Sequence, residues 1–93
     1  MKKQKLISIN YDSNSDVLYI SFGKATDAIS IEIEEGTLIR IDPFKQIIVG
    51  ITIVDFSAKY MGKGKKSVEL VANKIVPRIL DEYKSYLIQN QLN

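Results

Sequence analysis

The feature that most constrains this chain is the alternation of apolar and polar residues in short runs over residues 6–57. In the clearest run, Ala28 to Glu34, isoleucine occupies every second position and serine or glutamate lies between. Successive side chains of a β-strand point to opposite faces, so a period of two indicates a strand with one buried face and one solvated face. This part of the chain is therefore predicted to form an antiparallel sheet.

Turn residues separate five such runs. Asp12 to Asp16 is a cluster of short polar residues that bond their own backbone, which predicts a hairpin turn. Glu35-Gly36 predicts a tight turn in which the glycine supplies a positive φ, and Asp42-Pro43 opens a β-turn. The expected strands are Leu6 to Tyr11, Val17 to Phe22, Ala28 to Glu34, Thr37 to Ile41 and Ile47 to Val54.

The last of these runs differs from the others. Ile47 to Val54 is apolar on both sides apart from Gly50 and Thr52. Such a strand is typical of the middle of a sheet or of a position beneath a covering element. We therefore expect it to be central, with a second face that needs a cover.

An amphipathic helix is predicted in the C-terminal part. Apolar residues recur at steps of three and four from Val68 to Leu87, and Ser67 is a suitable N-cap. Pro77 interrupts the pattern, and a proline inside a helix costs about 3 kcal/mol. We expect either a kink near Asn73 or two helical pieces, with Pro77 in the first turn of the second.

These elements predict one domain of the α+β class over residues 1–93. An antiparallel β-meander of about five strands would span residues 6–57, a basic Gly/Lys linker residues 58–66, and a helical segment that packs on the sheet residues 67–90. A domain of this size buries only about 60 to 65% of its unfolded surface. A core this thin favours association with a partner.

The composition excludes most common catalytic chemistry. The chain has no His and no Cys, which removes the usual general base, the thiolate nucleophile, disulfides and ordinary zinc sites. No apolar run approaches the roughly 20 residues that span a bilayer, and no signal-peptide apolar region follows Met1 to Lys5. We expect a cytoplasmic protein without membrane contact, metal or cofactor, and not an enzyme.

The acidic residues are interpreted as structural. Asp12 and Asp16 flank a turn and could present carboxylates to Ca²⁺ or Mg²⁺, but their spacing is not that of an EF-hand and turn capping is preferred. Asp55 is expected to start a turn. Glu32 and Glu34 are expected on the solvated face, where they cannot serve as a general acid/base pair.

A lysine cluster between the sheet and the helix is the candidate binding feature. The cluster includes Tyr60 and contains no acid, and the lysines near the N-terminus could add to its charge. Such a concentration of positive charge suits non-specific binding of phosphates. Gly62 to Ser67 lacks the spacing of a phosphate loop. Against nucleic acid, the sheet region is acidic and only Arg40 and Arg78 could read bases. We prefer a solvated loop; the candidate contacts are Lys59, Lys63, Lys65 and Lys66.

Three segments carry a resemblance to a known family. They are Asn10 to Ile20, Glu35-Gly36 and Ile48 to Ser57. A Tyr-Asp turn leading to an aspartate, then a glycine turn, then a Val-Gly-Ile strand ending in Asp and a small residue resembles the domain of unknown function 2283 (DUF2283) family of small prokaryotic proteins. The resemblance covers about Ile9 to Ser57. It implies a compact β-meander with few helices and no established activity.

The leading hypothesis is a non-catalytic protein-interaction module. We expect a homodimer in which the helix or an open sheet edge is shared, because the strands and helix of one copy bury little area. The alternative is a nucleic-acid-binding accessory protein that uses the lysine cluster. A third hypothesis, an enzyme or small-ligand binder, would require a deep pocket with convergent polar groups.

Overall fold

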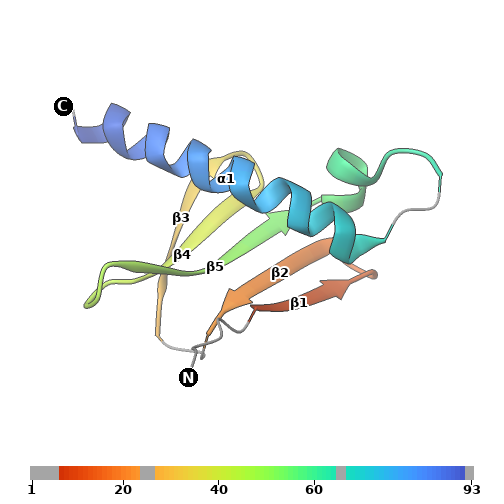
Figure 1. The fold of residues 1–93 in the computed structure, drawn as a ribbon, viewed down its shortest axis with the longest axis horizontal. Helices are drawn as coiled ribbons and strands as arrows, with labels where there is room; N and C mark the ends of the chain where they lie inside the picture. The colour runs from red at the N-terminus through yellow and green to blue at the C-terminus, as the bar shows by residue number, and fades with distance from the viewer. Residues whose placement is uncertain (1–6, 24–26, 65–66, 92–93) are drawn as a thin grey trace, which may run out of the picture.

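The computed structural model describes residues 7–23, 27–64 and 67–91, and it consists of a five-stranded antiparallel sheet with a long helix across one face (Figure 1). The strand order is β1-β2-β5-β4-β3. The α+β fold predicted from the sequence is confirmed. The elements are β1 (Ile7–Asp12), β2 (Val17–Phe22), β3 (Ile29–Glu34), β4 (Thr37–Asp42), β5 (Ile47–Val54), the π-helical turn η1 (Ser57–Met61) and α1 (Val68–Gln91).

The sheet consists of two antiparallel pieces that meet at β5. β1 and β2 form a hairpin, while β3, β4 and β5 lie in chain order, and β5 then pairs with β2. The meander-like arrangement therefore places β5 between β2 and β4. The predicted central position of this strand is confirmed, and its Ile51 and Ile53 are fully buried.

The second face of β5 is covered in part by a side chain of the sheet itself. Gly50 pairs with Ser21 on one side and Arg40 on the other. A Cβ on Gly50 would lie 2.8 Å from the Ile20 carbonyl oxygen and 3.2 Å from an Arg40 guanidinium nitrogen. Arg40 therefore lies over the glycine and supplies part of the cover that we expected from a separate element.

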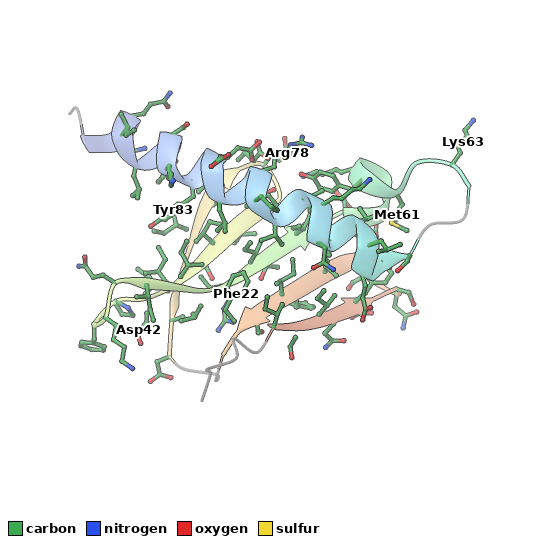
Figure 2. All side chains as sticks on the ribbon, in the orientation of Figure 1. Phe22, Asp42, Met61, Lys63, Arg78 and Tyr83 are labelled. Atoms are coloured by element: carbon green, nitrogen blue, oxygen red, sulfur yellow. The ribbon has the colours of Figure 1, made fainter. Side chains whose placement is uncertain are left out.

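The helix closes the opposite face of the sheet with an apolar stripe. Ala72, Ile75 and Ile79 of α1 are buried against the strands, and Tyr83 also faces the sheet (Figure 2). Because these positions recur at steps of three and four, they lie along one side of the helix. The strand and loop residues of this core are Leu18, Ile20, Ile39, Ile41, Ile51, Ile53 and Phe56.

α1 is one continuous helix that contains Pro77. We expected either a kink near Asn73 or two helical pieces, and the continuous helix excludes the second alternative. Pro77 lies on the exposed side of the helix, where water can hydrogen-bond the carbonyl group that the proline leaves without a donor. The predicted N-cap is confirmed, since the Ser67 hydroxyl accepts a hydrogen bond from the Leu70 amide at 3.3 Å.

The two predicted turns beside β4 are also confirmed. Gly36 has a φ of 82° in the turn between β3 and β4, which a residue with a Cβ would adopt only with strain. At the other end of β4, the buried Asp42 accepts hydrogen bonds from the Phe44 and Lys45 amides at 2.9 and 3.1 Å. These contacts fix the loop before the central strand.

We predict that Phe56→Ala destabilises the fold by about 3 to 5 kcal/mol, because it leaves a cavity in the core. The Phe56 side chain is 0% exposed, and its ring packs against those of Tyr11 and Tyr60. Urea unfolding measures the change in free energy. Phe44→Ala is the matched control, since Phe44 is 90% exposed and its loss should change stability by less than about 0.5 kcal/mol. Equal effects of the two changes would contradict this account of the core.

Candidate functional site

Part of the segment predicted to be a linker over 58–66 is a helical turn. Residues Ser57–Met61 form η1, which begins directly after the buried Phe56. The Phe56 ring lies 5.7 Å from that of Tyr11 and 5.9 Å from that of Tyr60, so η1 is held against the sheet by aromatic contacts. The i, i+4 spacing of Phe56 and Tyr60 is the sequence signal that could have indicated this turn.

A carboxylate also holds η1 in place from the β1–β2 hairpin. Asp16 Oδ1 accepts hydrogen bonds from the Tyr11 hydroxyl at 2.6 Å and the Ser57 amide at 2.8 Å. Its Oδ2 accepts the Ser57 hydroxyl at 2.9 Å, and its carbonyl oxygen accepts the Phe56 amide at 3.0 Å. One residue thus connects the first hairpin to the end of the central strand, 41 positions away along the chain.

These hydrogen bonds shift two titrations in opposite directions. The Tyr11 hydroxyl, followed by the Ser57 amide, lowers the pKa of Asp16 below its usual 3.8. The same hydrogen bond raises the pKa of Tyr11, because the phenol donates its proton to the carboxylate. Asp16 is therefore a charged acceptor at neutral pH.

The structure supports turn capping by Asp12. Its Oδ1 accepts hydrogen bonds from the Asn14 amide at 3.0 Å and the Ser15 amide at 3.4 Å. Both aspartates that we considered as cation ligands therefore bond the turn or η1. Among the residues that the structure describes, no group of three or more acids could hold a metal ion.

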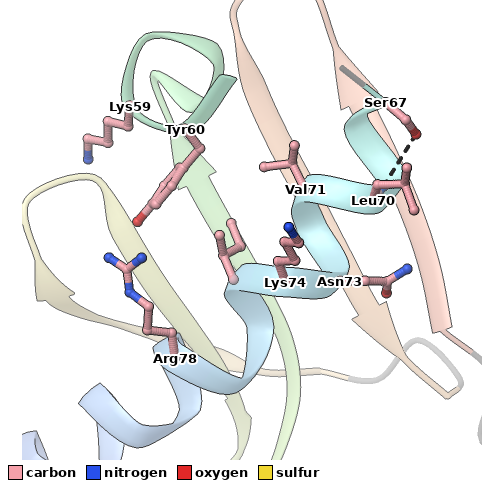
Figure 3. A pocket seen from close by; sticks show the side chains of 9 residues that line it. Lys59, Tyr60, Ser67, Leu70, Val71, Asn73, Lys74 and Arg78 are labelled. Atoms are coloured by element: carbon pink, nitrogen blue, oxygen red, sulfur yellow. Dashed lines mark hydrogen bonds between the residues drawn. The ribbon is translucent and has the colours of Figure 1, made fainter. Parts of the chain in front are cut away.

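A cleft lies between η1 and the N-terminal half of α1 (Figure 3). Its volume is about 960 Å³. The wall is apolar where α1 faces the sheet, and basic side chains stand at the rim. The described residues that line the cleft include no acid. They are Lys59, Tyr60, Ser67, Leu70, Val71, Asn73, Lys74, Ile75 and Arg78.

The basic side chains of the cleft come from two elements. Lys59 belongs to η1, and its Nζ donates a hydrogen bond to the Glu35 carbonyl oxygen at 2.6 Å, which fixes the direction of the side chain. Lys74 and Arg78 lie one turn apart on α1, so both reach the same side of the helix. In Figure 3 the polar ends of Lys59, Tyr60 and Arg78 gather at one end of the cleft.

Two carboxylates lie close to this end of the cleft. Burial raises the pKa of Glu82, the negative charge of Glu34 raises it further, and Arg78 lowers it. One Glu82 carboxylate oxygen is buried without a hydrogen-bond partner among the described residues. Burial and both glutamates also raise the pKa of Tyr60. Glu82 and Glu34 are therefore the acidic neighbours of the basic cleft.

Glu34 is exposed, as expected, but it does not share a sheet face with Glu32. The register shifts between these two residues, and Glu34 pairs with the buried Thr37. This bulge adds one residue to β3 and turns Glu34 to the face that carries α1. A strict period of two cannot reveal such a shift.

The predicted lysine cluster is divided by the structure. Lys59 lines the cleft, and Lys63 is exposed on the loop beyond η1 without lining it (Figure 2). Lys65 and Lys66 lie outside the described residues. The two helix residues that join Lys59 at the cleft are Lys74 and Arg78. We did not group them with Lys59 from the sequence because they belong to the helix, although their i, i+4 spacing is visible in the sequence.

The residues that match a known family cover the strands and end before the helix that lines the cleft. A family described as protein of unknown function (DUF2283) matches residues 8–57, which is more than half of the chain. The chain belongs to the DUF2283 family. The match ends at Ser57, the residue that bonds Asp16, whereas the basic residues of the cleft follow it.

The DUF2283 match has no counterpart in the other comparisons. No curated protein and no solved structure matches this chain. In the described parts of this DUF2283 protein, no helix combines the length and apolar character needed to cross a membrane. Function must therefore be inferred from the geometry.

We predict that Asp16→Asn lowers stability at neutral pH and that this loss disappears in acid. A folded-state pKa below 3.8 means that the Asp16 charge stabilises the fold above the unfolded-state pKa. The contribution is lost as the pH falls through the lowered value. Asparagine tolerates the φ of 60° at this position, so the change tests the carboxylate and not the backbone.

Urea unfolding between neutral pH and the acid range measures this difference. Asp27→Asn is the control, because Asp27 is an exposed aspartate and its loss should leave the pH dependence unchanged. A difference between wild type and Asp16→Asn that is the same at every pH would contradict the role given to the charge.

Proposed function

We propose that this protein is a non-catalytic protein-interaction module that acts as a homodimer. The observation that carries the proposal is that α1 is longer than its own sheet is wide. The helix has 24 residues, and at about 1.5 Å per residue it spans about 36 Å. The outer strands of a five-stranded sheet are only about 19 Å apart. In Figure 1 the last turns of α1 continue past β3.

The apolar stripe of α1 continues on these last turns. Tyr83 is the last helix residue that packs against the core, and Tyr86 and Leu87 follow it at i+3 and i+4. The rings of Tyr83 and Tyr86 stack at 6.5 Å, and Leu87 is 38% exposed. The core-facing side of the helix therefore extends over a region where its own chain supplies no sheet among the described residues.

The edge strand beside this overhang is open. β3 pairs with β4 on one side and has no other neighbour among the described strands. Ile29 pairs with the buried Ile41 and therefore lies on the face that carries α1, yet it is 51% exposed. The helix passes over the other end of β3, near Glu34, so it leaves Ile29 uncovered.

A second copy fits both features at once. If β3 paired antiparallel with β3 of a second copy about a two-fold axis, the Glu34 end of each strand would lie beside the Ile29 end of the other. The overhanging stripe of each helix would then cover Ile29 of the other copy. The same pairing would fill the open β3 edge of both sheets.

We predict that Leu87→Glu weakens the dimer by about tenfold or more, because it places a charge in the shared apolar contact. Sedimentation velocity over a concentration series measures the dissociation constant. Ile88→Glu is the matched control: Ile88 is 60% exposed in the same helical turn, but the next residue of a helix points about 100° further round. A wild-type protein that stays monomeric at every concentration would refute the proposal, as would equal effects of the two changes.

Nucleic-acid binding is the second candidate function. It is supported by the run of lysines from Lys59 to Lys66, which contains no acid, and by the exposure of Lys59 and Lys63. Each lysine that contacts a phosphate adds close to one unit to the slope of log affinity against log salt.

We predict for this candidate that Lys63→Gln reduces the salt slope of binding to a random DNA duplex by about one unit. Fluorescence anisotropy at low and high salt measures that slope. Lys84→Gln is the control, because Lys84 is an exposed lysine of α1 far along the chain from this run. Absence of any salt-sensitive binding by the wild type would end this candidate.

A further inference from the structure

We propose that the cleft between η1 and α1 binds a small phosphorylated ligand, a phosphomonoester with an apolar or planar body. The site lies at the N-terminal half of α1, away from the overhanging turns, so the inference is independent of the dimer. The cleft volume of about 960 Å³ is within the range of about 300 to 1,000 Å³ typical of small-molecule sites.

Three basic residues line this cleft, and the charged ends of Lys59 and Arg78 lie at the same end of it, whereas Lys74 lies further along (Figure 3). Lys59 reaches it from η1, while Lys74 and Arg78 reach it from consecutive turns of α1. Two or more cations around one site match the charge of close to −2 that a phosphomonoester carries at neutral pH. The planar Arg78 guanidinium can donate two parallel hydrogen bonds to phosphate oxygens, and a lysine supplies a point charge.

Lys59 and Tyr60 are held in place by contacts that do not involve a ligand. The Lys59 ammonium group donates one hydrogen bond to the Glu35 carbonyl oxygen and has two further N–H groups to offer. Tyr60 is held by a tilted ring contact with the buried Phe56. Their polar ends lie with that of Arg78 at one end of the cleft (Figure 3). The ordering of Lys59 and Tyr60 without a ligand lowers the entropy cost of binding at these two residues.

The rest of the lining defines the body of the ligand. Leu70 is 66% exposed in the first turn of α1 and contributes nothing to the core, while Val71 and Ile75 continue the wall beneath it. An apolar wall beside a basic rim suits a molecule with one charged end and one apolar or planar end. A long polyanion would instead also engage Lys63, which lies outside the lining.

Replacement of Glu82 should increase the affinity of the cleft for a phosphate. Glu82 follows Arg78 at i+4 on α1, so the two side chains lie on the same side of the helix and their opposite charges attract. A phosphate must compete with Glu82 for the guanidinium and is repelled by the carboxylate. Removing this charge while retaining the shape of the side chain should therefore tighten binding, an effect that a general loss of structure would not produce.

The test is calorimetric titration of the full chain with adenosine monophosphate, with inorganic phosphate and with adenosine. Adenosine monophosphate should bind more tightly than phosphate, and adenosine should bind at least about tenfold more weakly, which equals 1.4 kcal/mol. Arg78→Gln should weaken binding of the monophosphate about tenfold, whereas Glu82→Gln should strengthen it several-fold. Lys84→Gln is the matched control and should leave the affinity unchanged, because Lys84 is exposed on α1 and does not line the cleft. Circular dichroism checks that each variant is folded.

Amide chemical shifts locate the site independently of the variants. On titration, the shifts should concentrate at η1 and in the first three turns of α1. Three results would overturn the proposal: no saturable binding of adenosine monophosphate or phosphate up to about 10 mM, an equal loss in Arg78→Gln and Lys84→Gln, or chemical-shift changes outside the cleft. Binding of a random duplex without binding of the monophosphate would favour the nucleic-acid function instead.

Discussion

The fold depends on the carboxylate of Asp16. It accepts hydrogen bonds from Tyr11 in β1 and from the amide and hydroxyl of Ser57, which begins η1. Hydrogen bonds to a charged acceptor are stronger than those to a neutral acceptor. Here the Asp16 carboxylate uses them to connect the first hairpin to the end of the central strand. Together with the ring contacts of Phe56, this contact holds η1 against the sheet and so positions Lys59.

The two proposals use opposite ends of α1. At its first half the helix forms one wall of a cleft, and Lys74 and Arg78 meet Lys59 there because η1 is held against the sheet. At its far end the helix extends past β3, so the last turns of its apolar stripe cover no strand among the described residues. Because α1 is longer than the sheet is wide, its first half lines a polar site and its last turns present an apolar surface, while its middle packs on the sheet.

The strands could be read from the sequence because local patterns define them. The alternation of residues 28–34 and the turn at Gly36 both correspond to the structure, as does the central position of Ile47–Val54. The bulge near Glu34 could not be predicted from the sequence, because the extra residue is specified by the pairing of β3 with β4. The candidate site was predicted in part: Lys59 lies in it, but its partners Lys74 and Arg78 join it only because the chain folds back across the sheet.

The sequence by itself determined the fold class, the central strand, the N-cap at Ser67 and the absence of histidine and cysteine chemistry. These properties depend on neighbours in the chain or on composition. Only the tertiary structure decided that Pro77 stays within one helix, that η1 forms, and that basic residues from η1 and α1 line one cleft. Each of these depends on contacts between residues far apart in the chain, whose geometry no local pattern contains.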